Sequence, residues 1–208
     1  MPLSRELERT YSPSLSDDET RLSAIERLAH RGRSANQSFD GAEWLFWAVQ
    51  RFGDVGNGRR GVNMDDISHN GQPYPGSTDG MSMNRALYSL ASDVLVSTAR
   101  PSWGVAGLQS ASLPPSLDVP DGKKKAKWAL RPKHVPTKAS KRRDGIELPE
   151  NFAHCVLMHY RNEEEKAGKK VKNDEVRFAF STALVEALQV IAEPEETILP
   201  NADVQQLG

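Results

Sequence analysis

The segment of this 208-residue sequence with the clearest chemical potential is basic and covers residues 123–143. It holds ten lysines and arginines and no acidic residue. Setting these ten apart from the 27 basic side chains leaves 17 against 28 acidic ones, so the rest of the chain has a formal charge of −11. Clustered cations neutralise phosphates and release counterions. This charge asymmetry is therefore typical of a protein that contacts a polyanion.

Two interpretations of the basic segment stay open. Pro132 and Pro136, together with repulsion between like charges, are compatible with a solvated linker. Trp128 is a large apolar ring that suits a base or a packing surface better than a solvated linker. The charges are irregularly spaced, so we expect no helical or strand face here. We expect an extended segment that becomes ordered on a partner.

The other residues with catalytic or metal-binding potential form no recognisable site. His154 and His159 are five positions apart, whereas a helical zinc pair is separated by four. Cys155 adjoins His154, but neighbouring residues of a helix point in different directions, so we expect a buried thiol. Asp65 and Asp66 have no third carboxylate nearby to hold a cation. We expect no catalytic residue, metal or cofactor, and a protein that is not an enzyme.

The composition also restricts where the protein acts. No run of eighteen apolar residues exists, so we expect no membrane partner. The first nine residues are charged where a signal peptide has an apolar core, which argues against secretion by that route. A mean hydropathy of −0.59 is typical of an ordinary soluble protein with polar connectors. The single cysteine cannot form an internal disulfide, which suits a reducing, intracellular (cytoplasmic) compartment.

Helical periodicity predicts an all-α fold of about five helices joined by long loops. The first helix is expected to begin with a capping box at Ser16 and Glu19. The second is apolar around its whole circumference, which predicts burial on every side. The expected helices cover residues 16–31, 42–52, 82–98, 149–166 and 173–193.

These elements predict two helical halves between extended terminal arms. The parts are an N-terminal arm at 1–15, a helical core half at 16–101, a Pro-rich and basic connector at 102–148, a C-terminal helical half at 149–192 and a tail at 193–208. Long connections in a compact domain usually indicate function or contact with another chain. We therefore expect an assembly subunit that contacts copies of itself.

The glycine-rich turn at residues 56–61 matches the spacing of a dinucleotide-binding fingerprint. That fingerprint requires a preceding strand and a following helix. Here we expect a helix before the turn and a loop after it, so the match is interpreted as chance. Arg59 and Arg60 in this turn remain potential phosphate contacts.

Four short segments resemble the coat proteins of flexible filamentous plant viruses. They are a tryptophan-bearing helix, then Gly53-Asp54-Val55-Gly56, then Met83-Asn84-Arg85-Ala86-Leu87 opening a helix, and Arg177-Phe178-Ala179-Phe180 near the end. The chain departs from the family pattern at Ser181 and Thr182, where the late motif has its aspartate, and in its basic segment. The resemblance implies a subunit that polymerises along RNA, with Arg85 and Arg177 as RNA contacts. Surface or capping charge is the alternative for both arginines.

Two functional hypotheses follow. In the first, the protein is a structural subunit, coat-like or nucleocapsid-like, that self-assembles along single-stranded RNA in a virion or in the cytoplasm. In the second, it is a non-enzymatic adaptor whose basic segment docks on an acidic protein partner. The expected nucleic-acid contacts are Arg59, Arg60, Arg85, Lys123, Lys124, Lys125, Lys127, Trp128, Arg131, Lys133, Lys141, Arg142, Arg143 and Arg177.

Overall fold

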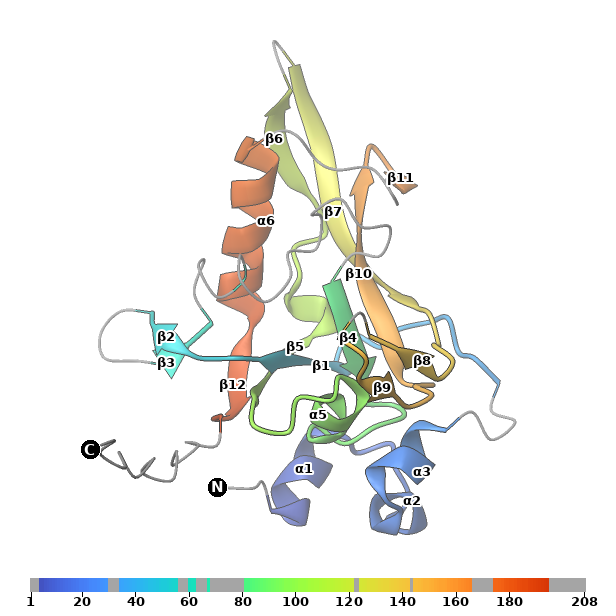
Figure 1. The fold of residues 1–208 in the computed structure, drawn as a ribbon. Coiled ribbons are helices and arrows are strands. Elements are labelled where there is room, and N and C mark those ends of the chain that lie inside the picture. The colour runs from blue at the N-terminus through green and yellow to red at the C-terminus, as the bar shows by residue number, and fades with distance from the viewer. Residues whose placement is uncertain are drawn as a thin grey trace, which may run out of the picture.

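The fold is mixed α/β and mainly β, so the prediction of an all-α protein is wrong. In the computed structural model, seven antiparallel strands form one sheet that is bent into a half-barrel (Figure 1). Among the described residues, only two helices reach seven residues or more. The structure describes residues 4–29, 34–55, 60–62, 67, 81–121, 124–142, 144–165 and 174–194.

The sheet brings together strands that are far apart in the sequence. From one edge to the other, its order is β12 (Gln189–Ala192), β5 (Gly104–Gln109), β1 (Trp44–Val49), β4 (Met81–Arg85), β10 (His154–Arg161), β7 (Lys124–His134) and β6 (Leu117–Asp121). A short strand, β11 (Glu164–Glu165), pairs with the end of β10. Two small hairpins stand apart from this sheet: β2 (Gly53–Asp54) with β3 (Arg60–Gly61), and β8 (Ser140–Lys141) with β9 (Glu147–Leu148).

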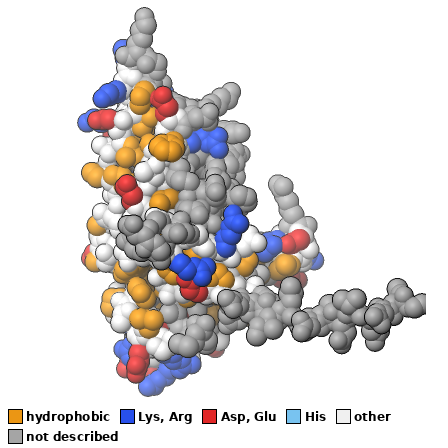
Figure 2. All heavy atoms as spheres, turned by 90° about the vertical axis from the view of Figure 1, so that its left-hand side faces the viewer, with side chains coloured by type: hydrophobic (Ala, Val, Ile, Leu, Met, Phe, Trp, Pro, Cys, Tyr) orange, Lys and Arg blue, Asp and Glu red, His pale blue; other side chains and the backbone are white. Residues whose placement is uncertain are grey.

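One face of the sheet is covered by α6 (Asp174–Ala187), the longest described helix (Figure 1). Its Val176, Phe180 and Leu184 are buried in the same core cluster as Trp128 and Leu130 of β7. The outer side of α6 carries Phe178, which is 66% exposed, and Figure 2 shows apolar side chains along this side of the molecule.

Short helices gather at the other end of the molecule (Figure 1). They are α1 (Arg5–Tyr11), α2 (Asp17–Arg21), α3 (Ala24–Leu28) and α5 (Asp93–Ser97), and a single 3-10 turn covers Ser110–Ser112. A second, smaller core cluster contains Phe46 and Ala48 of β1 together with Val94 of α5. The sheet is therefore buried on both faces where β1 crosses it.

Three of the five expected helices are corrected by the structure. Residues 42–52 contain β1, because a strand that is buried on both faces is as continuously apolar as a buried helix. Residues 149–166 contain β10 for the same reason. Residues 82–98 contain β4, a turn and the five-residue α5. The first expected helix is divided into α2 and α3, and its capping box at Ser16 and Glu19 is confirmed. The last expected helix is confirmed as α6, which ends earlier, at Ala187.

The basic segment is neither a linker nor irregularly spaced. Most of it is β7, which pairs with β10 from Trp128 to His134 and with β6 from Lys124 to Trp128. Pro132 lies where β7 has a neighbouring strand on one side only, a place where a sheet tolerates the missing N–H. The expected connector at 102–148 thus supplies β5, β6 and β7 to the main sheet.

Candidate nucleic-acid interface

The basic residues of β7 form a row on one face of the sheet. Lys125, Lys127, Arg131 and Lys133 are exposed at alternate positions, and we call these four residues the basic face. The intervening Ala126, Trp128 and Leu130 are buried in the core that includes α6. Since a strand rises 3.2–3.4 Å per residue, cations two positions apart are about 6.6 Å apart and the whole row covers about 26 Å. The uncharged Ala129 interrupts the row between Lys127 and Arg131.

Two carboxylates lie next to the basic face. Asp118 of β6 is the register partner of Lys127. Glu163 accepts a hydrogen bond of 2.6 Å from Arg131, and the two side chains are 73% and 44% exposed. An exposed pair of this kind contributes about 0–1 kcal/mol. The energetic cost of exchanging Glu163 for a phosphate is therefore small.

An aromatic side chain accompanies the cations. Tyr160 of β10 is the register partner of Ala129, so its side chain is on the same face as Lys127 and Arg131. The guanidinium of Arg131 lies 5.2 Å from the centre of the Tyr160 ring, which is partly exposed. The basic face thus combines charge with one ring on which a base could stack.

Trp128, which we expected to contact a base, points to the opposite side. Its side chain is in the core with 8% exposure, and its ring meets that of Phe180 edge-on at 6.0 Å between centroids. The alternation along β7 explains this position, because Trp128 is out of phase with the basic face. As the structure places it, this ring is a packing group and offers no surface to a nucleic acid.

Arg85, the second residue with an unexpected position, is completely buried. Its Nε and one Nη donate to the two carboxylate oxygens of Glu43, each at 2.7 Å. The remaining N–H groups donate to the carbonyl of Ser38 at 2.7 Å, to the carbonyl of Asn36 and to Nδ1 of His134 at 3.0 Å. A guanidinium has five donors, so this one is fully occupied. Arg85 is therefore neither a surface charge nor accessible to RNA in this structure.

His134, at the end of β7, is held in its neutral form by this arrangement. Because Arg85 must donate, Nδ1 of His134 accepts, and the proton of the neutral ring is on Nε2. Burial, followed by the positive charge of Arg85, lowers the pKa of His134 to about 4. Protonation would place two positive charges side by side in the interior.

We expect His134 to make the fold sensitive to acid. Its pKa is about 4 when folded and 6.5 as a free side chain, so the unfolded chain binds the proton first as the pH falls. This contribution to the free energy of unfolding is nearly complete above pH 6.5 and is lost as the pH falls from 6.5 towards 4, so the loss reaches about 3 kcal/mol at pH 4. His134→Asn keeps an acceptor for Arg85 without titrating. Between pH 7 and pH 4, urea unfolding should show a steeper decrease in the free energy of unfolding for the natural protein than for the variant. Parallel pH dependences would contradict the role given to His134.

The other predicted contacts are more scattered. Lys124 is exposed near the end of the β6–β7 hairpin, and Lys141 is exposed on β8. Arg142 pairs with Asp144 and donates to the carbonyl of Thr98 at 3.2 Å. Arg60 of β3 pairs with Glu193 at 3.4 Å. Arg177 is partly exposed on α6, across the sheet from the basic face. Arg59, Lys123 and Arg143 lie outside the described residues.

Outside the basic face, the described part of the chain offers no metal site, no exposed thiol and no membrane-spanning helix. No group of three or more His, Cys, Asp or Glu residues there is placed to hold a metal ion. Cys155 is fully buried, as expected, and burial raises the pKa of its thiol. No helix within the described ranges is long and apolar enough to cross a membrane.

In comparisons with known proteins, no family model, no curated protein and no solved structure matches the chain significantly.

Proposed function

We propose that this protein is a non-enzymatic subunit that binds single-stranded RNA through the basic face of β7. The observation that carries the proposal is the row of four exposed cations opposite a row of core residues. Along its whole length, β7 is hydrogen-bonded to at least one neighbouring strand. This pairing holds the four cations at fixed spacing. Less conformational entropy is then lost on binding than with a mobile basic segment.

The shape of the site favours a single strand over a duplex. The cations follow one line of about 26 Å along a strand. A flexible single strand can follow this line while an unpaired base stacks on Tyr160, whereas the bases of a duplex are already stacked. We therefore propose single-stranded RNA as the polyanion that the basic face binds.

We extend the proposal to assembly along the RNA, in a coat-like or nucleocapsid-like manner. Binding through only four phosphate contacts is weak at physiological salt, because the affinity from such contacts decreases steeply as the salt concentration rises. Several copies on one strand raise the overall affinity without any new contact in each copy. Sedimentation with RNA of increasing length should show more than one copy per strand. One copy regardless of length would contradict assembly.

The binding site is tested by the salt dependence of affinity. If the basic face neutralises four phosphates of a single-stranded RNA of about twelve nucleotides, log K against log[salt] should have a slope of about −2.8. Replacing Lys127 and Arg131 by Gln should reduce this slope to about −1.4. The measurement is fluorescence anisotropy on the full chain at several salt concentrations.

A matched control separates the basic face from general charge. The exposed Arg5 and Arg21, in the helices α1 and α2, are replaced by Gln to give the same change in net charge. We expect this variant to keep the natural slope.

Glu163→Gln should tighten binding, because Arg131 loses its competing carboxylate.

Two results would contradict the RNA proposal. One is affinity that does not depend on salt, and the other is an equal loss in the Lys127/Arg131 variant and the Arg5/Arg21 variant. If the natural protein binds no RNA but binds polyglutamate in a salt-dependent manner through the basic face, the adaptor hypothesis with an acidic protein partner takes its place.

A further inference from the structure

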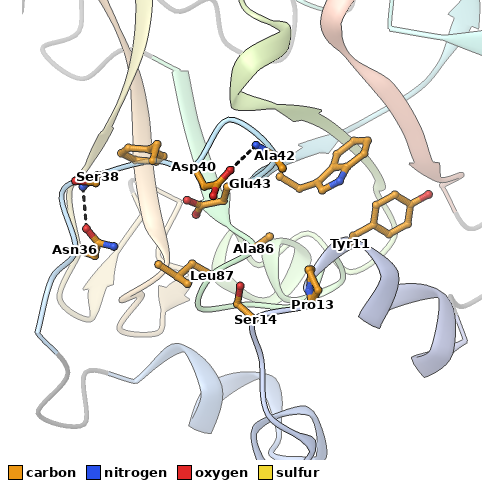
Figure 3. A pocket seen from close by; sticks show the side chains of 12 residues that line it. Tyr11, Pro13, Ser14, Asn36, Ser38, Asp40, Ala42, Glu43, Ala86 and Leu87 are labelled. Atoms are coloured by element: carbon orange, nitrogen blue, oxygen red, sulfur yellow. Dashed lines mark hydrogen bonds between the residues drawn. The ribbon is translucent and has the colours of Figure 1, made fainter.

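A cavity of about 510 Å³ is lined by residues between 36 and 44, by Ala86 and Leu87, and by the chain that links α1 to α2. Figure 3 shows Asp40 and Glu43 on one wall, with Ser14 and Leu87 on the other. Trp44, which follows Glu43 in the chain, also lines the cavity. Its size is within the range of about 300–1,000 Å³ that is usual for small-molecule sites.

The walls of this cavity are acidic. Among the described residues that line it, Asp40 and Glu43 are the charged ones, and none is Lys, Arg or His. Glu43 is already compensated by Arg85 behind it. Asp40 accepts a hydrogen bond of 2.8 Å from the backbone N–H of Ala42, and its carboxylate has no cationic partner among the described residues. The negative charge available to a ligand is therefore that of Asp40.

Aromatic rings form another part of the lining. Trp44 is half-buried and meets the Tyr11 ring edge-on, with 5.0 Å between centroids. Phe39 already has the guanidinium of Arg85 on one face, at 3.8 Å from the ring centre. Trp is the aromatic residue that attracts cations most strongly. Trp44 is thus the ring best suited to a cationic ligand.

The wall that carries Asp40 and Trp44 is held in place without a ligand. The backbone N–H groups of Ser110 and Ala111 donate to the carbonyls of Glu43 and Gly41, each at 3.0 Å. Arg85 holds the same segment from behind through the Ser38 carbonyl. A site that is already ordered loses little entropy on binding.

We propose that this cavity binds a small organic cation, with its ammonium group at Asp40 and its apolar body against Trp44 and Leu87. Asp40 supplies the charge, Trp44 an attractive ring face, and Leu87 an apolar wall. The site is independent of the basic face, which is of opposite charge and belongs to β7.

The probe is choline, compared with 3,3-dimethylbutan-1-ol, a neutral molecule of the same shape. Both are titrated into the isotopically labelled full-length protein, and the Trp44 indole N–H signal is followed by NMR. Choline should shift this signal with a millimolar Kd that rises with salt. The neutral alcohol should bind at least about fivefold more weakly, because it lacks the charge.

Two variants test whether Asp40 supplies the negative charge that binds the cation. Asp40→Asn keeps the oxygen that accepts from Ala42, so the turn should remain, and choline binding should weaken about fivefold. Ser38→Lys introduces an ammonium group at the exposed side of the cavity and should abolish binding. Asp118→Asn, on β6, is the matched control and should change nothing. Equal binding of the alcohol, an unchanged Kd in Asp40→Asn, or no shift of the Trp44 signal would overturn the proposal.

Discussion

Replacing Arg85 with methionine is expected to destabilise the protein by about 3–5 kcal/mol, because the buried Glu43 carboxylate would lose its only counter-charge among the described residues. The carbonyls of Asn36 and Ser38 and Nδ1 of His134 would lose their donor at the same time. Domains of this size are stable by about 5–15 kcal/mol, so the loss is a large part of the total. Urea unfolding monitored by circular dichroism measures it.

The control for this prediction is an exposed arginine in an ion pair of similar length. Arg131→Met breaks the 2.6 Å pair with Glu163 and should cost about 0–1 kcal/mol. Arg85→Lys should remain clearly destabilised, since an ammonium group has three donors and cannot replace a planar group with five. Removing both charges, with Arg85→Met and Glu43→Leu, should cost less than the sum of the single changes. A loss for Arg85→Met as small as that for Arg131→Met would contradict a buried cluster.

Local patterns in the sequence predicted local features well. The capping box at Ser16 and Glu19 forms as expected, because its partners are three residues apart. The helix α6 was also recognisable, because Val176, Phe180 and Leu184 recur at helical spacing and are buried, while Glu175 and Glu186 are exposed; Phe178 is an apolar residue that is exposed as well. In both places, the pattern that predicts the structure is formed by residues that are close together in the sequence.

The strands β1 and β10 were not recognised, for a physical reason. In β1, Leu45 and Trp47 belong to the core cluster that includes α6, while Phe46 and Ala48 belong to the second cluster. With both faces buried, the alternation that identifies a strand disappears. Length and apolar content then suit a helix equally well.

The strand β7 carried a usable signal that its charge concealed. Lys125, Ala126, Lys127 and Trp128 alternate, and so do Leu130 and Arg131 in the same phase. The number of lysines and the two prolines, Pro132 and Pro136, make the spacing of this segment look irregular. The period of two would have predicted both the strand and the inward position of Trp128.

The Arg85 cluster has no counterpart in local sequence. Glu43 is 42 positions from Arg85, and His134 is 49 positions away on the other side. They meet because β1 and β4 are neighbours in the sheet, with Leu45 opposite Arg85, and because β7 ends nearby. Only the strand order could have placed Arg85 in the interior.

The second large effect is expected at Arg27, the other arginine of the described chain that is buried in an ion pair, with 4% exposure. Its Nε and one Nη donate to the two oxygens of Asp93, at 2.6 and 2.8 Å. Its other Nη donates to the carbonyls of Glu19 and Leu22, at 2.9 and 2.7 Å. One side chain of α3 thus connects the end of α2 to α5. Arg27→Met should destabilise the protein by about 3–5 kcal/mol, since it leaves the charge of Asp93 buried.

Hydrogen exchange distinguishes this effect from that of Arg85, because the two arginines hold different parts of the fold. Arg27 joins short helices at one end of the molecule, so Arg27→Met should increase exchange first in α2, α3 and α5, while β7 and β10 stay protected. Arg85→Met should weaken the sheet itself, because Arg85 is part of β4 and contacts the end of β7. Arg9→Met, which removes an exposed pair with Asp17, is the control and should cost about 0–1 kcal/mol. If Arg27→Met raised exchange equally throughout the sheet, the helices would unfold only together with the sheet, and the connection through Asp93 would not be a separate local unit.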